Sequence, residues 1–324
     1  MLDCIVIGAG QAGLAVGYYL RKKGLDFVLL DAESGPGAAW RHTWPSLTLF
    51  SNAASSNLPG WPMPHYEGFP PASHVIDYFA RYEQRYELPI RRPVRVDEVT
   101  HDGACFHVYA GEEKLTSRTV VAATGTWSAP FIPYYPGNFG GRQWHSAFYP
   151  GPADFAGSTV AVVGAANSGA QIAAELLLSG VETTWYTRSS PQWMPDDVDG
   201  RVLFQRNRAR LNAMLRGEPD PGADSNLGDI VMVPPVQRAR DSGLLQATPM
   251  FSSLDEVNTD HLIWCTGFRP ALRPIRGLLA GTSPTVDGLF LVGYGTWTGP
   301  GSATITGVSP FARQTAQAVA NICD

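Results

Sequence analysis

One glycine pattern occurs twice in this chain and constrains its fold more than any other feature. The first copy reads Gly-Ala-Gly-Gln-Ala-Gly at residues 8–13, and the second reads Gly-Ala-Ala-Asn-Ser-Gly at residues 164–169. Each copy follows a short apolar run, at residues 4–7 and 160–163. Glycines at these spacings allow a tight turn from a buried strand into a helix whose N-terminus binds a pyrophosphate. The repeat therefore predicts two dinucleotide sites.

The first copy is framed by the elements that a dinucleotide fold needs. An amphipathic segment follows it, and a second apolar run at residues 27–30 ends at Asp31. A carboxylate at this position is typical of one that accepts a hydrogen bond from a ribose hydroxyl. We therefore expect Asp31 to bind the first nucleotide.

The second copy has no acid at the corresponding place. The chain has Thr187 there, followed by Arg188 and Ser189. An arginine and serines suit a 2'-phosphate, which a carboxylate would repel, so the pattern favours NADPH over NADH. The alternative is that Arg188 is a solvated surface residue. Ala166 replaces a glycine of the pattern, so the turn must keep a negative φ there.

The rest of the chain indicates a duplicated α/β unit. Related strands close both halves, ending in Thr124-Gly125 and Thr266-Gly267, and each leads into a proline-marked loop. A last strand, a glycine-rich turn and a helix from about Ser302 to Asn321 are expected to return to the first half. We predict an α/β, three-layer fold of two Rossmann-like dinucleotide-binding domains, the second inserted into the first. The first would cover residues 1–153 and 276–324, and the second residues 154–275.

Composition excludes several classes of protein. The formal net charge of -5 gives no basic face for nucleic acid. The four cysteines are scattered without a CxxC pair, which argues against a dithiol reductase, a disulfide framework and a metal site. No apolar stretch is long enough to span a membrane, and a strand begins too close to Met1 for a signal peptide. We expect a cytoplasmic protein.

A family resemblance rests on residues 139–149, Phe-Gly-Gly-Arg-Gln-Trp-His-Ser-Ala-Phe-Tyr. They match the FxGxxxHxxx(Phe/Tyr) signature of the flavin-containing monooxygenases, which belong to the class B flavoprotein monooxygenases. Together with both glycine patterns, the resemblance covers nearly the whole chain. It is strongest to short bacterial members, including those of arsenic operons, at residues 40–44 and 196–204.

The resemblance implies FAD in the first site and NADPH in the second, with NADH as a weaker alternative. It implies a monooxygenase that forms a flavin hydroperoxide and oxygenates a soft nucleophile, a sulfide or an amine. Baeyer–Villiger enzymes end a similar signature in Trp-Pro, whereas this chain has Tyr149-Pro150, so a ketone is the less favoured substrate. Two alternatives stay open: an NADPH oxidase or flavin reductase of the same fold, and a non-catalytic nucleotide-sensing protein. The expected partners are a small-molecule substrate and O2, and a homodimer is possible.

The glycine patterns and the resemblance together give the cofactor-binding residues that we expect. These are Gly8, Gly10, Gln11, Ala12, Gly13, Asp31, Trp40, Arg41, Val94, Thr124, Gly125, Gly164, Ala166, Asn167, Ser168, Gly169, Arg188, Ser189, Thr266, Gly267, Gly293, Ser302 and Ala303. The helix expected from Ser302 would direct its N-terminal dipole at the flavin.

Two further residues take roles from the resemblance. Asn52 lies in a stretch similar to one whose asparagine is near the reactive carbon of the flavin, so Asn52 is our catalytic candidate at the oxygen site. The alternative is that Asn52 caps its own turn. His145 belongs to the signature, and we expect it to organise the joint between the domains rather than to transfer a proton.

Overall fold

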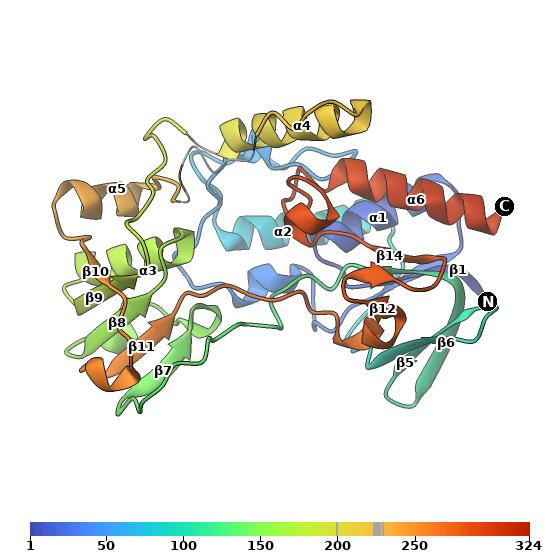
Figure 1. Ribbon diagram of the computed structural model, residues 1–324. Helices are drawn as coiled ribbons and strands as arrows, with labels where there is room; N and C mark the ends of the chain where they lie inside the picture. Colours follow the sequence, from blue (N-terminus) through green and yellow to red (C-terminus); the bar gives the residue numbers. More distant parts are fainter. Residues whose placement is uncertain (199, 223–227, 229) are drawn as a thin grey trace.

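The computed structural model describes residues 1–198, 200–222, 228 and 230–324 and contains two sheets, each with helices packed against it (Figure 1). In spatial order, the parallel strands of the first sheet are β3 (Ile90–Arg91), β2 (Phe27–Leu30), β1 (Leu2–Ile7), β6 (Glu113–Ala122) and β14 (Leu289–Leu291). Two antiparallel strands, β4 (Glu98–His101) and β5 (Phe106–Ala110), extend it from the first part of β6.

The first sheet is the middle of three layers. The helices α1 (Gln11–Lys22), α2 (Ala72–Arg85) and α6 (Ser309–Cys323) pack on one face, where Val6, Leu29 and Val121 point into their core. Alternate residues, among them Ile5 and Val28, face the β4–β5 side instead. Burial on both faces explains why these strands read as continuous apolar runs.

The second sheet is entirely parallel. Its order is β10 (Ala247–Pro249), β9 (Glu182–Thr187), β8 (Thr159–Val163), β11 (His261–Trp264) and β7 (Arg142–His145). The helices α3 (Asn167–Leu178) and α5 (Pro234–Asp241) share a core with one face, while α4 (Gly200–Arg216) lies at the top of Figure 1.

Short elements complete the described chain. They are the 3-10 helices η1 (Ala38–His42), η2 (Ala53–Ser55), η3 (Ser146–Phe148), η4 (Pro152–Phe155), η6 (Leu254–Glu256), η7 (Arg273–Leu278) and η8 (Gly295–Thr298), and the hairpin of β12 (Leu279–Ala280) with β13 (Ser283–Pro284).

The predicted α/β fold with an inserted second sheet is confirmed. After the second sheet the chain returns to the first, where β14 pairs with β6 and α6 packs against α1. Both termini therefore lie at the same end of the molecule (Figure 1). The domain limits stay a prediction, and β7 bears on them, because it precedes residue 153 yet pairs with β11 in the second sheet.

One expectation about the C-terminal segment is wrong. The helix predicted from about Ser302 begins at Ser309, and hydrogen-bonded turns fill residues 301–308. Gly307 explains the delay, because a Cβ on it would lie 2.3 Å from the carbonyl oxygen of Gly301. Such a close contact belongs to a tight turn rather than to a regular helix.

Two crossover segments hold the sheets next to each other. The N–H of Phe131 donates to the carbonyl of Gly267 (3.0 Å), that of Arg269 to Ala129 (2.8 Å) and that of Ala271 to Gly125 (2.9 Å). The loops that leave β6 and β11 therefore run side by side in opposite directions, so the carboxyl ends of both sheets meet at this junction.

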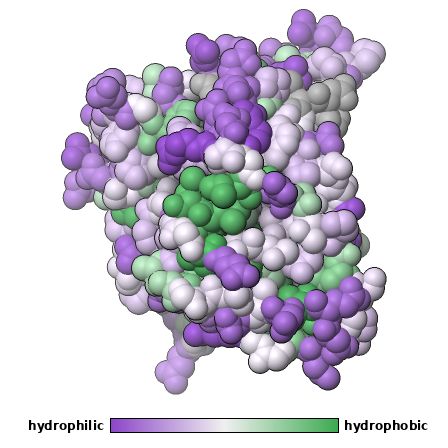
Figure 2. Space-filling view, turned by 90° about the vertical axis from the view of Figure 1, so that its left-hand side faces the viewer, coloured by the Kyte–Doolittle hydropathy of each residue, from purple (hydrophilic) through white to green (hydrophobic). Residues whose placement is uncertain are grey.

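The surface on the α3 and α5 side carries one compact hydrophobic patch among mostly hydrophilic side chains (Figure 2). Two exposed leucines belong to these segments: Leu178, the last residue of α3, is 39% exposed, and Leu244, shortly after α5, is 45% exposed. Within the described part of the chain, no helix combines the length and the apolar character that crossing a membrane requires.

Candidate FAD and NADPH sites

The first glycine turn, residues 8–13, has a geometry that only glycine permits. Gly8 adopts a φ of +101°, and a Cβ on it would lie 2.5 Å from the carbonyl oxygen of Ala123. A Cβ on Gly13 would lie 1.9 Å from the carbonyl oxygen of Gly8. The strand, the turn and α1 are therefore in backbone contact, which brings the start of α1 over the end of β1.

The second glycine turn, residues 164–169, repeats this geometry. Gly164 adopts a φ of +138°, and Cβ atoms on Gly164 and Gly169 would lie 2.4 Å from the Cys265 carbonyl and 2.1 Å from the Gly164 carbonyl. Ala166 has a φ of -111°, so the predicted negative value is confirmed.

Both helices begin without a side-chain cap. The residue before α1 is Gly10 and the residue before α3 is Ala166, and neither helix start has a capping hydrogen bond from a side chain. The first N–H groups of each helix thus stay available for an anion, which the helix dipole also favours. The two turns fit two pyrophosphates.

A cavity of about 540 Å³ opens at the second glycine turn. It is lined by Phe131, Pro133, Tyr135, Val163, Gly164, Ala165, Ala166, Asn167, Ser168, Tyr186, Arg188, Met250, Trp264, Cys265, Thr266 and Gly267. Seven of the expected residues are among these, namely Gly164, Ala166, Asn167, Ser168, Arg188, Thr266 and Gly267. Gly169 lies beneath the turn, and Ser189 is exposed beyond the lining.

Arg188 and Asn167 have defined partners at this cavity. An Nη atom of Arg188 donates to the hydroxyl of Tyr135 at 3.2 Å, while the Arg188 side chain stays exposed at the end of β9. Sequence reasoning did not select Tyr135, whose position in the proline-marked loop was the only signal. The Asn167 side chain instead accepts from the N–H of Val231 at 2.8 Å, which ties the start of α3 to the segment before α5.

The carboxylate expected at the end of β2 is buried. Asp31 is 4% exposed, and its Oδ2 accepts from Nε of Arg92 at 2.6 Å. The N–H of Val94 donates to the carbonyl of Asp31 at 2.7 Å, so the Val94 backbone fixes Asp31. Sequence reasoning missed Arg92, since nothing in its local pattern distinguishes it.

Four expected residues meet at the start of α1. The amide of Gln11 donates to the carbonyl of Ala303 at 3.0 Å, and a Cβ on Gly293 would lie 2.6 Å from that of Ala12. The loop after β14 therefore closes on α1. Ser302 is fully buried, and its hydroxyl donates to the Gly295 carbonyl at 2.8 Å, so that side chain organises its own loop.

The two Thr-Gly pairs lock the crossover segments together. The Thr124 hydroxyl donates to the carbonyl of Ala271 at 2.8 Å, and the Thr266 hydroxyl donates to that of Phe131 at 2.5 Å. The hydroxyl of Tyr294 lies 2.7 Å from the Thr124 hydroxyl and accepts from the Thr124 N–H at 3.2 Å. Each threonine thus bonds the loop that comes from the other sheet.

Trp40 and Arg41 lie in η1, in the loop that follows Asp31. The Arg41 guanidinium donates to the Ser34 hydroxyl at 3.1 Å and lies 3.6 Å from Glu33. Trp40 packs against the core of the first sheet. In this structure the two side chains shape the loop beside the first glycine turn.

Asn52 precedes η2 and is exposed. Its side-chain oxygen accepts from the N–H of Ser55 at 3.0 Å. This geometry is that of a helix cap, which is the alternative role that the sequence left open. A role at the oxygen site would depend on the amide nitrogen, and it stays a prediction.

His145 is buried at the end of β7, with 2% exposure. Its Nδ1 accepts from the N–H of Ala147 at 3.1 Å, so Nε2 carries the proton and donates to the carbonyl of Gly267 at 2.9 Å. Burial lowers the pKa of His145, and a neutral ring in this position fixes the crossover segment. The geometry agrees with the expected organising role.

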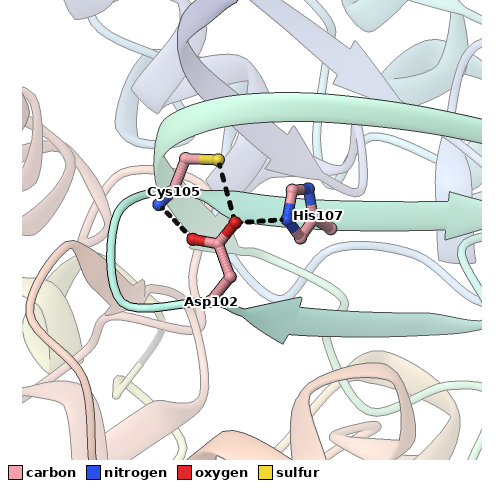
Figure 3. A group of neighbouring side chains, drawn as sticks. All are labelled: Asp102, Cys105 and His107. Atoms are coloured by element: carbon pink, nitrogen blue, oxygen red, sulfur yellow. Dashed lines mark hydrogen bonds and ion pairs between the residues drawn. The ribbon is translucent and has the colours of Figure 1, made fainter.

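A separate cluster of three side chains of the types that bind metal ions, Asp102, Cys105 and His107, lies on the β4–β5 hairpin (Figure 3). Asp102 accepts from the N–H groups of Ala104 and Cys105, both at 2.9 Å, and lies 2.8 Å from Nε2 of His107. The His107 Nδ1 is buried and has no hydrogen-bond partner among the described residues. A metal on Nε2 would leave a proton on Nδ1, where metal-binding histidines need an acceptor. We therefore interpret these hydrogen bonds as contacts that stabilise the turn of the β4–β5 hairpin rather than as a metal site.

Comparisons with known proteins show the family of this chain. The pyridine nucleotide-disulphide oxidoreductase family model matches residues 5–289. A flavin-containing monooxygenase from Stenotrophomonas maltophilia is 43% identical, with a TM-score of 0.87, and the match covers 100% of this chain and 99% of that chain. A double mutant of a flavin monooxygenase from Stenotrophomonas maltophilia is 44% identical, with a TM-score of 0.88, and this match also covers 100% of this chain and 99% of that chain. The chain belongs to the flavin-containing monooxygenases.

A more distant relative matches nearly the whole chain, and a more distant structure shares its fold. The uncharacterized oxidoreductase CzcO of Bacillus subtilis is 30% identical, and the match covers 95% of this chain and 96% of the relative. A structure of OTEMO, described as a complex with FAD and NADP, shares the fold at 16% identity and a TM-score of 0.64, over 99% of this chain and 85% of that chain.

Membership agrees with the predicted enzyme class and cofactors. This flavin-containing monooxygenase is an oxidoreductase, and its first and second glycine turns fit FAD and NADPH, the cofactors expected. Cys4, Cys105, Cys265 and Cys323 are all free in the structure.

Proposed function

We propose that this flavin-containing monooxygenase depends on NADPH and transfers one oxygen atom of O2 to a soft nucleophile, a sulfide or an amine. The observation that carries this proposal is the pairing of the two crossover segments, residues 125–131 and 267–271. It puts the carboxyl ends of both sheets at one junction, where we expect a bound nicotinamide to reach a bound flavin. Each glycine turn then supplies one of the two nucleotides.

The preference for NADPH rests on the end of β9. Residues 187–190 at the end of β9 include no carboxylate. Arg188 is exposed on the rim of the cavity, with its guanidinium next to Tyr135. A guanidinium forms short charge-assisted hydrogen bonds with a phosphate, so the 2'-phosphate of NADPH would bind here. NADH lacks this group and would bind more weakly.

The protein's own contribution to the reaction is positioning. Bound FAD supplies the oxygen-activating chemistry, and the protein orients the nicotinamide and excludes water. His145 donates its Nε2 proton to the Gly267 carbonyl and so stabilises the fold of the junction between the sheets. Asn52 would contribute through its amide nitrogen, since its oxygen already holds the Ser55 N–H. A homodimer and a cytoplasmic location stay predictions.

Oxygen uptake tests the proposal. FAD-loaded protein is mixed with NADPH in the presence and absence of an aryl methyl sulfide, and sulfoxide and peroxide are measured. We expect sulfoxide in proportion to the NADPH consumed. NADPH consumption with peroxide alone would instead assign an oxidase, and no consumption would leave a nucleotide-binding protein without turnover.

A further inference from the structure

The ribose-binding carboxylate of the first site is held by a second residue. Arg92 follows β3, 61 residues after Asp31 in the chain, and its Nε donates to Oδ2 of Asp31 at 2.6 Å. The side chains of Arg92 and Asp31 are 12% and 6% exposed. This pair is therefore buried at the point where the fold predicts the adenosine ribose.

Arg92 is in turn fixed by Glu83 on α2. Its Nη1 and Nη2 each donate to one oxygen of the Glu83 carboxylate, both at 2.8 Å. The Glu83 side chain is only 11% exposed. Two parallel bonds between a guanidinium and a carboxylate set the orientation of both planes. The Arg92 guanidinium therefore donates one hydrogen bond to Asp31 and two to Glu83, which together fix its orientation.

The backbone around Arg92 fixes Asp31 from two more directions. The N–H of Asp31 donates to the carbonyl of Arg91 at 3.1 Å, and the N–H of Val94 donates to the carbonyl of Asp31 at 2.7 Å. Pairing of β3 with β2 sets this register. Within the described residues, the hydrogen bonds to the Asp31 carboxylate reach only Oδ2. Oδ1 therefore stays available to accept a bond from a ribose hydroxyl.

Charge supports the same reading. The three side chains are two carboxylates and one guanidinium, and Glu83 takes both terminal nitrogens of Arg92. Burial raises the pKa of Glu83, and the hydrogen bonds from Arg92 oppose that rise. One guanidinium does not neutralise both carboxylates, but it donates to each of them and so lowers the cost of keeping the Asp31 carboxylate charged in its buried position.

We infer that Arg92, fixed by Glu83, is a positioning residue for FAD, which orients the Asp31 carboxylate toward the adenosine ribose. The inference rests on the proposed FAD site. It assigns Arg92 no contact with the flavin ring, so Arg92 acts on the affinity for FAD rather than on the reaction at the ring.

A double-mutant cycle on FAD binding tests the inference. Apoprotein is titrated with FAD, and Kd is measured from flavin fluorescence for the wild type, Asp31→Asn, Arg92→Gln and the double variant. We expect Kd to rise about 10-fold for each single variant, the loss of one hydrogen bond to a charged group. Because Arg92 acts through Asp31, the double variant should bind FAD no more weakly than Asp31→Asn. Effects that multiply fully in the double variant would overturn the inference.

Two further variants separate positioning from folding. Arg91→Gln is the matched control, since Arg91 is the adjacent arginine and pairs with Glu113 at the surface, with 43% of its side chain exposed. It should bind FAD like the wild type. Arg92→Lys keeps the charge but cannot bond Asp31 and both Glu83 oxygens together, so it should also weaken FAD while keeping the wild-type kcat at saturating FAD.

The outcomes also separate this inference from the proposed function. Wild-type FAD affinity in Arg92→Lys and Arg92→Gln would overturn the inference, as would a lowered kcat at saturating FAD in a folded Arg92→Lys protein. Wild-type protein that binds no FAD would refute the proposed function itself.

Discussion

The two glycine turns have the same backbone and different strand ends. In both, the last glycine of the turn packs against the carbonyl of the first, with added Cβ atoms at 1.9 and 2.1 Å, and the helix starts without a cap. Buried Asp31 directly follows the strand after the first turn, whereas exposed Arg188 directly follows the strand after the second. On the proposed function, the shared backbone would bind a pyrophosphate in each site, and the residue after the strand would select the nucleotide.

The largest effect is expected where the two turns are identical. Gly13→Ala puts a methyl group into the carbonyl of Gly8, and the backbone shift should cost about 3 kcal/mol of folding free energy and abolish FAD binding. Urea unfolding and the flavin content of purified protein measure both effects.

Gly169→Ala is the matched change in the second turn. It should lose NADPH binding by a similar distortion while the protein stays yellow. Loss of flavin from both variants alike would mean that the two turns do not act as separate sites.

The next effect concerns the strand ends. Arg188→Ala removes the guanidinium proposed for the 2'-phosphate, so KM for NADPH should rise about 10-fold or more, the worth of a hydrogen bond to a charged group, while KM for NADH stays unchanged. Tyr135→Phe removes only the hydroxyl that Arg188 bonds, so it should raise KM for NADPH less than Arg188→Ala does. Equal losses for both nucleotides in Arg188→Ala would remove the assigned role.

The hydrogen bonds of Thr124 and Thr266 should contribute differently to the free energy of unfolding. Thr124→Val removes the bond to Ala271 and leaves the Tyr294 hydroxyl without its acceptor, which should cost about 2 kcal/mol of folding free energy. Thr266→Val breaks only the bond to Phe131 and should cost about 1 kcal/mol. Urea unfolding measures both, and an equal cost would show that the bond with Tyr294 adds nothing.

The smallest effect is expected at Asn52. Asn52→Ala removes the cap of η2 and should cost about 1 kcal/mol of stability. If its amide nitrogen also serves the oxygen site, the share of NADPH consumed as peroxide should rise. Asn52→Asp keeps the capping oxygen and removes the amide donor, so it separates the two roles. Unchanged peroxide in both variants would leave Asn52 with the cap alone.

The sequence predicts the local geometry well and the long-range partners poorly. Gly8 and Gly164 could be placed because a positive φ and a close backbone contact leave no other residue possible. Arg92 could not be linked to Asp31, because the bond depends on the pairing of β3 with β2, which are far apart in the chain. The sequence predicts a helix from about Ser302, yet the turns at Gly301 and Gly307 displace its start to Ser309. Tyr135 lies in a loop without periodicity, so its bond with Arg188 needed the structure.

Anaerobic mixing of the FAD-loaded protein with NADPH tests most directly whether the two sites adjoin. Since hydride transfer requires the nicotinamide to touch the flavin, we predict that NADPH bleaches the yellow absorbance and that O2 restores it. Flavin that stays oxidised while NADPH is bound would show that the two sites do not adjoin.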